Sequence, residues 1–189
     1  GKKIYLLPKA DAIVDPKQED CAYPFKSLCG TGVAYQLMTL LFRRMKRTMS
    51  HQEIFLQYTA IATVADVMEL VGENRILVRK GLSYLNHTNH TGLRALMEVC
   101  GIAPEQVRAY HIGFILGPCF NAAGRLDTIV HALALLESKE YDQALALAGE
   151  LWAMNEERKE LTRVGTERAV EIIEHATWKD EHVYLVYIK

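Results

Sequence analysis

The chain has 189 residues, half of them apolar, and a formal net charge of −1. This length is enough for one or two domains with cores of their own. The near-neutral charge gives no overall basic signature for nucleic acid and no acidic signature for a cation sink. No apolar run approaches the ~18 residues of a membrane span, so no membrane partner is expected.

The first helix is predicted from Thr31, after short strands or extended chain at residues 3–7 and 12–14 and a loop rich in Pro, Asp and Lys. A second helix is predicted after Ser50, which forms a capping-box pattern with Glu53. Two further short helices are predicted over residues 74–88 and 91–102. Within them, a close-packing role is predicted for Gly81 and a helix C-cap for Gly101.

Residues 113–128, "GFILGPCFNAAGRLDT", combine three glycines with a proline and predict a loop packed close to another group. An amphipathic helix is predicted next, over residues 129–138. Residues 141–176 carry a long helical pattern whose charged middle, "NEERKE", suits a helix that crosses between domains. The final "EHVYLVYIK" shows the β-branched and aromatic pattern of a strand.

The four cysteines, Cys21, Cys29, Cys100 and Cys119, are widely spaced, and none forms a Cys-x-x-Cys pair. This spacing excludes a zinc ribbon. No long apolar stretch followed by a cleavage site lies near the N-terminus, so no signal peptide is expected. We therefore predict a cytoplasmic protein with free thiols, while a disulfide between any two cysteines remains open.

Asp66 sits inside an otherwise apolar run, Ile61 to Leu70, and this pattern predicts a buried carboxylate. Burying a lone carboxylate is unfavourable unless another group pairs with it. One interpretation is a metal ligand, because a divalent cation would offset the desolvation. The other interpretation is a helix cap or a partner of Arg75 or Arg79, because one carboxylate cannot hold a hard cation by itself.

Two stretches could bind an anion. In "CGTGVAYQL", Thr31 and Gly32 stand at a helix start whose backbone N–H groups could hold phosphate, although an ordinary helix start explains them equally well. In "NAAGRLD", small residues allow close approach, and Asn121 and Arg125 offer hydrogen bonds. Arg favours phosphate, but a structural loop with Arg125 paired to Asp127 remains open.

Four stretches together resemble one family: "YPFKSLCGTGVAYQL", "TVADVMELVGENRILVRKGL", "GPCFNAAGRLD" and "MNEERKELT". Their order and spacing are similar to those of RecJ-type single-strand-specific DNA exonucleases of the DHH phosphoesterase superfamily. The resemblance implies a helix-rich α/β fold. Residues 1–138 would be the back half of a parallel-sheet DHH domain, 139–178 a long interdomain helix, and 179–189 the first strand of a DHHA1 domain. The family's Asp-His-His motif does not precede "VDPKQEDCAYPFKSL" here.

By this resemblance Asp66 matches the fourth metal-binding motif, and the implied cofactor is Mn²⁺ or Mg²⁺ held jointly with aspartates and histidines upstream. The implied activity is 5′-to-3′ hydrolysis of single-stranded DNA in repair and recombination. The chain by itself is expected to be inactive and not to bind the metal. Arg125 and Asn121 are implied contacts to nucleic acid or phosphate, with Thr31 and Gly32 near the catalytic face.

One departure from the family concerns Cys119 and Phe120, where many relatives carry Arg-Leu or Arg-Ile; the basic contact is lost or moved. Two other functions stay open: a DHH phosphoesterase acting on short oligoribonucleotides or small nucleotides, and a non-enzymatic helical interaction module. Loss of the first part of a parallel sheet would expose apolar surface, so a homodimer is also expected.

Overall fold

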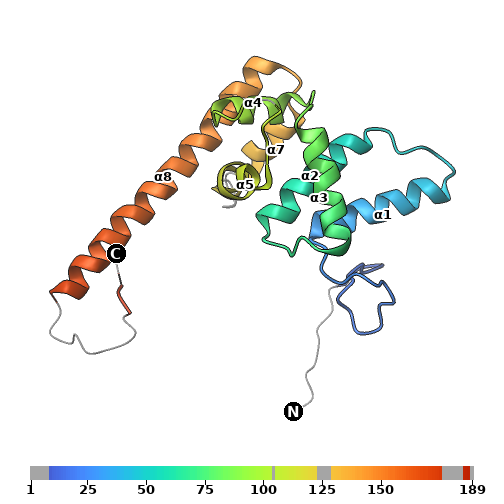
Figure 1. Ribbon diagram of the computed structural model, residues 1–189, viewed down its shortest axis with the longest axis horizontal. Helices are drawn as coiled ribbons and strands as arrows, with labels where there is room; N and C mark the ends of the chain where they lie inside the picture. Colours follow the sequence, from blue (N-terminus) through green and yellow to red (C-terminus); the bar gives the residue numbers. More distant parts are fainter. Residues whose placement is uncertain (1–8, 104, 123–128, 176–184, 188–189) are drawn as a thin grey trace, which may run out of the picture. The chain divides into compact units, whose positions relative to one another are not determined.

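The computed structural model describes residues 9–103, 105–122, 129–175 and 185–187. The chain divides into two compact units, residues 1–86 and 87–189. Every regular element within the described residues is helical, as the helix-rich prediction requires (Figure 1). The parallel sheet stays a prediction, since residues 3–7 and most of 179–189 lie outside the described ranges and residues 12–14 are irregular.

The first unit contains three helices where the apolar spacing predicts them. They are α1 (Gly30–Arg44), α2 (Gln52–Ala65) and α3 (Gly72–Leu85). Their core includes four buried side chains, Leu28, Tyr35, Leu56 and Leu77. Burial of these apolar side chains holds the loop before α1 and all three helices together.

Helices α2 and α3 pack side by side because a glycine lies at their contact (Figure 1). A Cβ atom at Gly81 would stand 2.3 Å from the carbonyl oxygen of Leu56 and 2.5 Å from the Cβ of Ala60. Only a hydrogen at this position lets the two backbones approach so closely. The predicted close-packing role of Gly81 is confirmed.

The capping box predicted from Ser50 and Glu53 is wrong. Helix α2 begins at Gln52, its N-cap is His51, and no side chain caps it. The backbone of His51 is left-handed, with φ of 60°. A Ser50 cap needs the helix to start one residue earlier, and the left-handed turn at His51 prevents that start.

The second unit contains the remaining elements of the described chain. They are α4 (Thr91–Val99), α5 (Ala109–His111), the π-helix η1 (Ile112–Leu116), α6 (Gly117–Ala122), α7 (Ile129–Glu137) and α8 (Tyr141–Glu174). Helix α8 packs against α4, α6 and α7. The predicted helices over residues 91–102 and 129–138 are confirmed, apart from their last residues.

The loop predicted for residues 113–128 is wrong over residues 113–122, which are helical. Pro118 lacks an N–H and would break the bonding of an uninterrupted α-helix. The wider turn of η1 ends at Leu116, and Pro118 is the second residue of α6, in a first turn where a missing N–H is tolerated. Residues 123–128 lie outside the described ranges.

Helix α8 is one uninterrupted helix of 34 residues (Figure 1), or roughly 50 Å. Its buried residues, Ala144, Ala148, Leu151 and Asn155, all lie in the first half. The second half is exposed and carries ion pairs of Arg163 with Glu160 and Glu167. An exposed charged half agrees with a connecting helix, while the predicted domain limits at 138, 139 and 178 remain predictions.

Much of the apolar face of α1 is exposed. Leu37, Leu40 and Leu41 are each nearly half exposed. Self-association through such a surface stays a prediction, for which sedimentation of the purified chain is the measurement. No helix in the described ranges is long and apolar enough to cross a membrane.

Two glycine substitutions test the packing of α2 on α3. Gly81→Ala should lower the free energy of unfolding by about 1–3 kcal/mol, because the added methyl group overlaps the Leu56 carbonyl. Gly149→Ala in α8 is the control, since no atom of the described residues lies within 4 Å of its Cβ position. It should raise that free energy by about 0.5–1 kcal/mol. Urea unfolding measures both, and equal effects would contradict the proposed contact.

Candidate functional site

Asp66 is the C-cap residue of α2, and its side chain is exposed. The predicted burial of this carboxylate is therefore wrong. The first part of the apolar run, residues 61–65, is the end of α2, and the helix stops at Asp66, in the middle of the run. Residues next to Asp66 in sequence consequently do not enclose it in space.

The chain leaves α2 through a Schellman motif. The N–H of Val67 donates to the carbonyl of Val64 at 3.1 Å, and the N–H of Met68 donates to that of Thr63 at 3.1 Å. Val67 is left-handed, with φ of 54°, and 88% exposed. Glycine is the usual residue at this position, because a β-branched side chain is strained there. No burial of the Val67 side chain offsets this strain.

The same motif ends two other helices. Lys46 follows α1 with φ of 52°, and Gly101 follows α4 with φ of 67°. Gly101 therefore confirms the predicted C-cap signal. Among these three left-handed positions, Val67 carries the least suitable side chain, and it is the one beside the candidate metal ligand.

The Asp66 carboxylate has neither an ion pair nor a hydrogen bond to another group in the described ranges. A partnership with Arg75 or Arg79 is therefore not formed there. Negative charge at a helix C-terminus is disfavoured by about 0.3–1 kcal/mol, because the helix dipole is negative at that end. Among the described residues, Asp66 thus has no charged partner, and its carboxylate faces solvent.

The N-terminus of α1 lies against the last turn of α2. Cys29 is the N-cap of α1, and its Sγ accepts a hydrogen bond from the N–H of Gly32 at 3.4 Å. The same Sγ stands 3.4 Å from Oγ1 of Thr63, three residues before Asp66. Gly32 is buried and Thr31 is exposed. The fold thus brings Thr31 and Gly32 near the end of α2 that carries Asp66.

Asn74 holds the connection between α2 and α3 in place. Its buried side chain donates to the carbonyl of Ser27 at 2.7 Å and to that of Glu69 at 3.0 Å. These two bonds tie the segment after Asp66 to the segment before α1. Loss of either bond would leave a partly buried polar group without that partner. Sequence reasoning did not single out Asn74, because both partners are backbone atoms that only the fold supplies.

Glu73 organises a second contact between these segments. Its Oε2 accepts hydrogen bonds from the hydroxyl of Tyr23 at 2.7 Å and from Nε2 of Gln36 at 3.0 Å. Burial, followed by the hydrogen bond to Glu73, raises the pKa of Tyr23 to about 12. The phenol therefore remains a donor to Glu73 throughout the physiological range.

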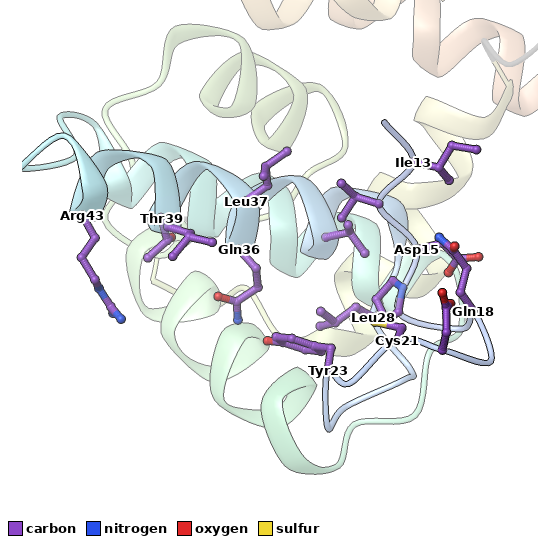
Figure 2. A pocket seen from close by; sticks show the side chains of 15 residues that line it. Ile13, Asp15, Gln18, Cys21, Tyr23, Leu28, Gln36, Leu37, Thr39 and Arg43 are labelled. Atoms are coloured by element: carbon purple, nitrogen blue, oxygen red, sulfur yellow. The ribbon is translucent and has the colours of Figure 1, made fainter. Parts of the chain in front are cut away.

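Tyr23 and Gln36 also line a cavity of about 520 Å³ between residues 13–28 and α1. Figure 2 shows Gln36 pointing from α1 towards Tyr23. The rest of the lining is mainly apolar, with Arg43 as the one cation among the described lining residues. Such a lining does not match the chemistry of a phosphate chain.

Within the described ranges, no group of three or more His, Cys, Asp or Glu side chains could hold a metal ion. Asp66 is exposed and forms no ion pair with any described residue, so its carboxylate suits one ligand of a hard cation. A complete coordination shell needs oxygen or nitrogen ligands from elsewhere.

Of the two nucleic-acid contacts predicted in the second unit, one lies within the described residues. Asn121 is exposed on α6, whereas Arg125 lies outside the described residues. Nearby in sequence, Tyr110 and Phe114 are 61% and 68% exposed, and their rings stack with centroids 4.9 Å apart. Sequence analysis missed this aromatic pair. The spacing i, i+4 was the available signal, because it places two side chains on one helical face.

Several known proteins that are similar to this chain are RecJ exonucleases specific for single-stranded DNA. This chain is 42% identical over 165 residues to RecJ of Salmonella typhimurium, and the match covers 82% of this chain and 29% of that protein. It is 37% identical over 168 residues to RecJ of Bacillus subtilis, covering 89% of this chain and 21% of that protein. The chain therefore spans less than a third of the length of these curated relatives. No protein-family model matches it.

Solved structures of RecJ from Thermus thermophilus share the fold. One, in complex with Mg²⁺, has a TM-score of 0.69 and 33% identity, covering 78% of this chain and 23% of that chain. Another, in complex with Mn²⁺, has a TM-score of 0.70 and 31% identity, covering 85% of this chain and 23% of that chain. Divalent metal ions are thus bound by these structural relatives.

Three substitutions test the strain at the helix ends. Val67→Gly should raise the free energy of unfolding by about 1 kcal/mol, because glycine adopts the left-handed conformation freely. Lys46→Gly should raise it less, since lysine is not branched at Cβ. Gly101→Ala should lower it by about 1 kcal/mol. Urea unfolding followed by circular dichroism measures the series, and a loss of stability in Val67→Gly would contradict the assigned strain.

Proposed function

We infer that this chain, which is homologous to a segment of the RecJ exonucleases, forms part of a metal-dependent enzyme that hydrolyses single-stranded DNA from its 5′ end. The observation that carries this proposal is sequence identity of 37–42% to RecJ over more than four-fifths of the chain, joined by the shared fold. A role in repair and recombination and a cytoplasmic location are parts of the same proposal.

The proposed role of Asp66 is that of one carboxylate ligand of a Mn²⁺ or Mg²⁺ ion. When bound, such an ion lowers the pKa of a water molecule and stabilises charge that develops on the phosphate. The end of α2 supports this role, because it presents a carboxylate with no competing ion pair in the described ranges. Asn74 would keep the segment after Asp66 in position through its bonds to Ser27 and Glu69.

The proposed nucleic-acid contacts are Asn121 and Arg125, with Thr31 and Gly32 near the reacting phosphate. Tyr110 and Phe114 would add a stacking surface for unpaired bases. Exposed aromatic faces bind bases of any sequence, but only where the bases are not already paired in a duplex. A preference for single strands is therefore consistent with the exposed pair.

The metal-ligand role predicts a sharp difference between two carboxylates of one segment. In the full-length enzyme proposed here, Asp66→Asn should lower kcat for single-stranded DNA at least about 100-fold, since changes in outer-shell groups alone cost about 10- to 100-fold. Glu69→Gln is the matched control, because Glu69 is also exposed and offers its backbone carbonyl to Asn74. It should retain most activity.

The assay is release of nucleotides from 5′-labelled DNA with manganese, run in parallel on short oligoribonucleotides. Equal activity of the two variants would remove Asp66 from the metal site. Faster cleavage of the oligoribonucleotides than of DNA would reassign the substrate within the superfamily.

The aromatic pair predicts an effect on binding rather than on the reaction. Replacing Tyr110 and Phe114 by Ala in the full-length enzyme should weaken binding of single-stranded DNA roughly 5- to 150-fold, because loss of one stacked base costs about 1–3 kcal/mol. Tyr84→Ala, which removes an exposed ring of α3, is the control and should leave the Kd unchanged. Fluorescence anisotropy with a labelled oligonucleotide measures the Kd, and an unchanged Kd in the double variant would exclude stacking there.

A further inference from the structure

Two of the four cysteines meet in the second unit. Cys100 is the C-cap residue of α4, and Cys119 lies in α6. Their Sγ atoms are 3.9 Å apart and share a hydrogen bond, although 19 residues separate them in sequence. The other two cysteines belong to the first unit, where the Sγ of Cys29 contacts Thr63 and Gly32. The thiol pair is therefore a product of the tertiary fold, in which α4 and α6 both pack against α8.

The thiol–thiol hydrogen bond favours a shared negative charge. It lowers the pKa of Cys119, whose thiolate would accept the bond, and raises the pKa of Cys100, whose S–H donates it. The ammonium group of Lys159 on α8 favours a thiolate on either sulfur, while Glu156 acts in the opposite direction. When the two sulfurs share one proton, one of them is a thiolate, and the thiolate is the nucleophilic form of cysteine.

Access to the pair is one-sided. Cys119 is completely buried, whereas Cys100 is partly exposed. A reagent in solution therefore reaches Cys100 first. Cys119 stands behind it at a distance from which a second sulfur can attack, since the two atoms need to approach from 3.9 Å to about 2.05 Å to form a bond.

We propose that Cys100 and Cys119 form an oxidisable dithiol, a modification site that closes to an intramolecular disulfide on reaction with a hydroperoxide. Cys100 passes the shared proton to Cys119 and thereby becomes the thiolate. The accessible Cys100 thiolate then attacks the peroxide. An S–O bond forms, the O–O bond breaks, and the leaving oxygen takes up a proton to give water or an alcohol. Cys119 then attacks the sulfenic acid. The S–S bond forms, the S–O bond breaks, and hydroxide leaves with the remaining proton as water.

The disulfide would join the end of α4 to the helix that carries Asn121. Helix α6 already packs against η1 and α8, and the disulfide would add a covalent link from α6 to α4. The unfolded chain would also be constrained by the closed loop between the two cysteines. Oxidation is therefore expected to raise the thermal unfolding midpoint, independently of any nuclease activity.

The test uses the purified, fully reduced 189-residue chain and hydrogen peroxide at equimolar concentration. Wild-type chain in native buffer should lose two of its four free thiols without forming disulfide-linked dimers, and peptide mapping should find Cys100 joined to Cys119. The Cys21→Ser/Cys29→Ser variant should behave in the same way. Cys100→Ser and Cys119→Ser should each abolish the internal link, with circular dichroism reporting whether each variant is folded.

Mapping of the wild-type chain decides the matter even if a variant fails to fold. The same treatment in urea provides the reference, because an unfolded chain pairs its cysteines without regard to α4 and α6. Equal proportions of all pairings in native buffer and in urea would overturn the proposal. Oxidation of native Cys100 to sulfinic acid without a link to Cys119 would overturn it as well.

Discussion

The carboxylate of Asp66 stands at the C-terminus of α2, where the helix dipole disfavours negative charge. The next residue, Val67, keeps a left-handed backbone that its branched side chain resists. No ion pair offsets the first effect in the described ranges, and no burial offsets the second. Unfavourable local features without a structural gain are typical of functional sites. A bound cation would offset the charge of Asp66, and this end of α2 therefore supports the proposed metal site.

Uncharged contacts hold this helix end in position. The sulfur of Cys29 joins the start of α1 to Thr63, and the amide of Asn74 joins Ser27 to Glu69. Because none of these groups carries a charge, they define the geometry without neutralising Asp66. The segment is thereby held in place while the Asp66 carboxylate stays available to bind a metal ion. The proposed role, in which other parts of a larger enzyme supply the remaining ligands, requires both properties.

The second unit depends on how the chain accommodates Pro118. The π-helix η1 precedes it, so helical structure continues into α6 despite the missing N–H. This continuation brings Cys119 against Cys100 and leaves Tyr110 and Phe114 on the surface. One backbone adjustment therefore underlies both the aromatic pair and the thiol pair.

Local patterns in the sequence determined most helices, the Gly101 cap and the close packing at Gly81, because these depend on residues near one another along the chain. The motif around Asp66 indicated the candidate ligand. Tertiary structure alone decided that Asp66 is exposed, that residues 113–122 are helical, and that Asn74 reaches Ser27. Exposure and long-range hydrogen bonds depend on which distant segments meet, and neighbours in sequence do not specify that meeting.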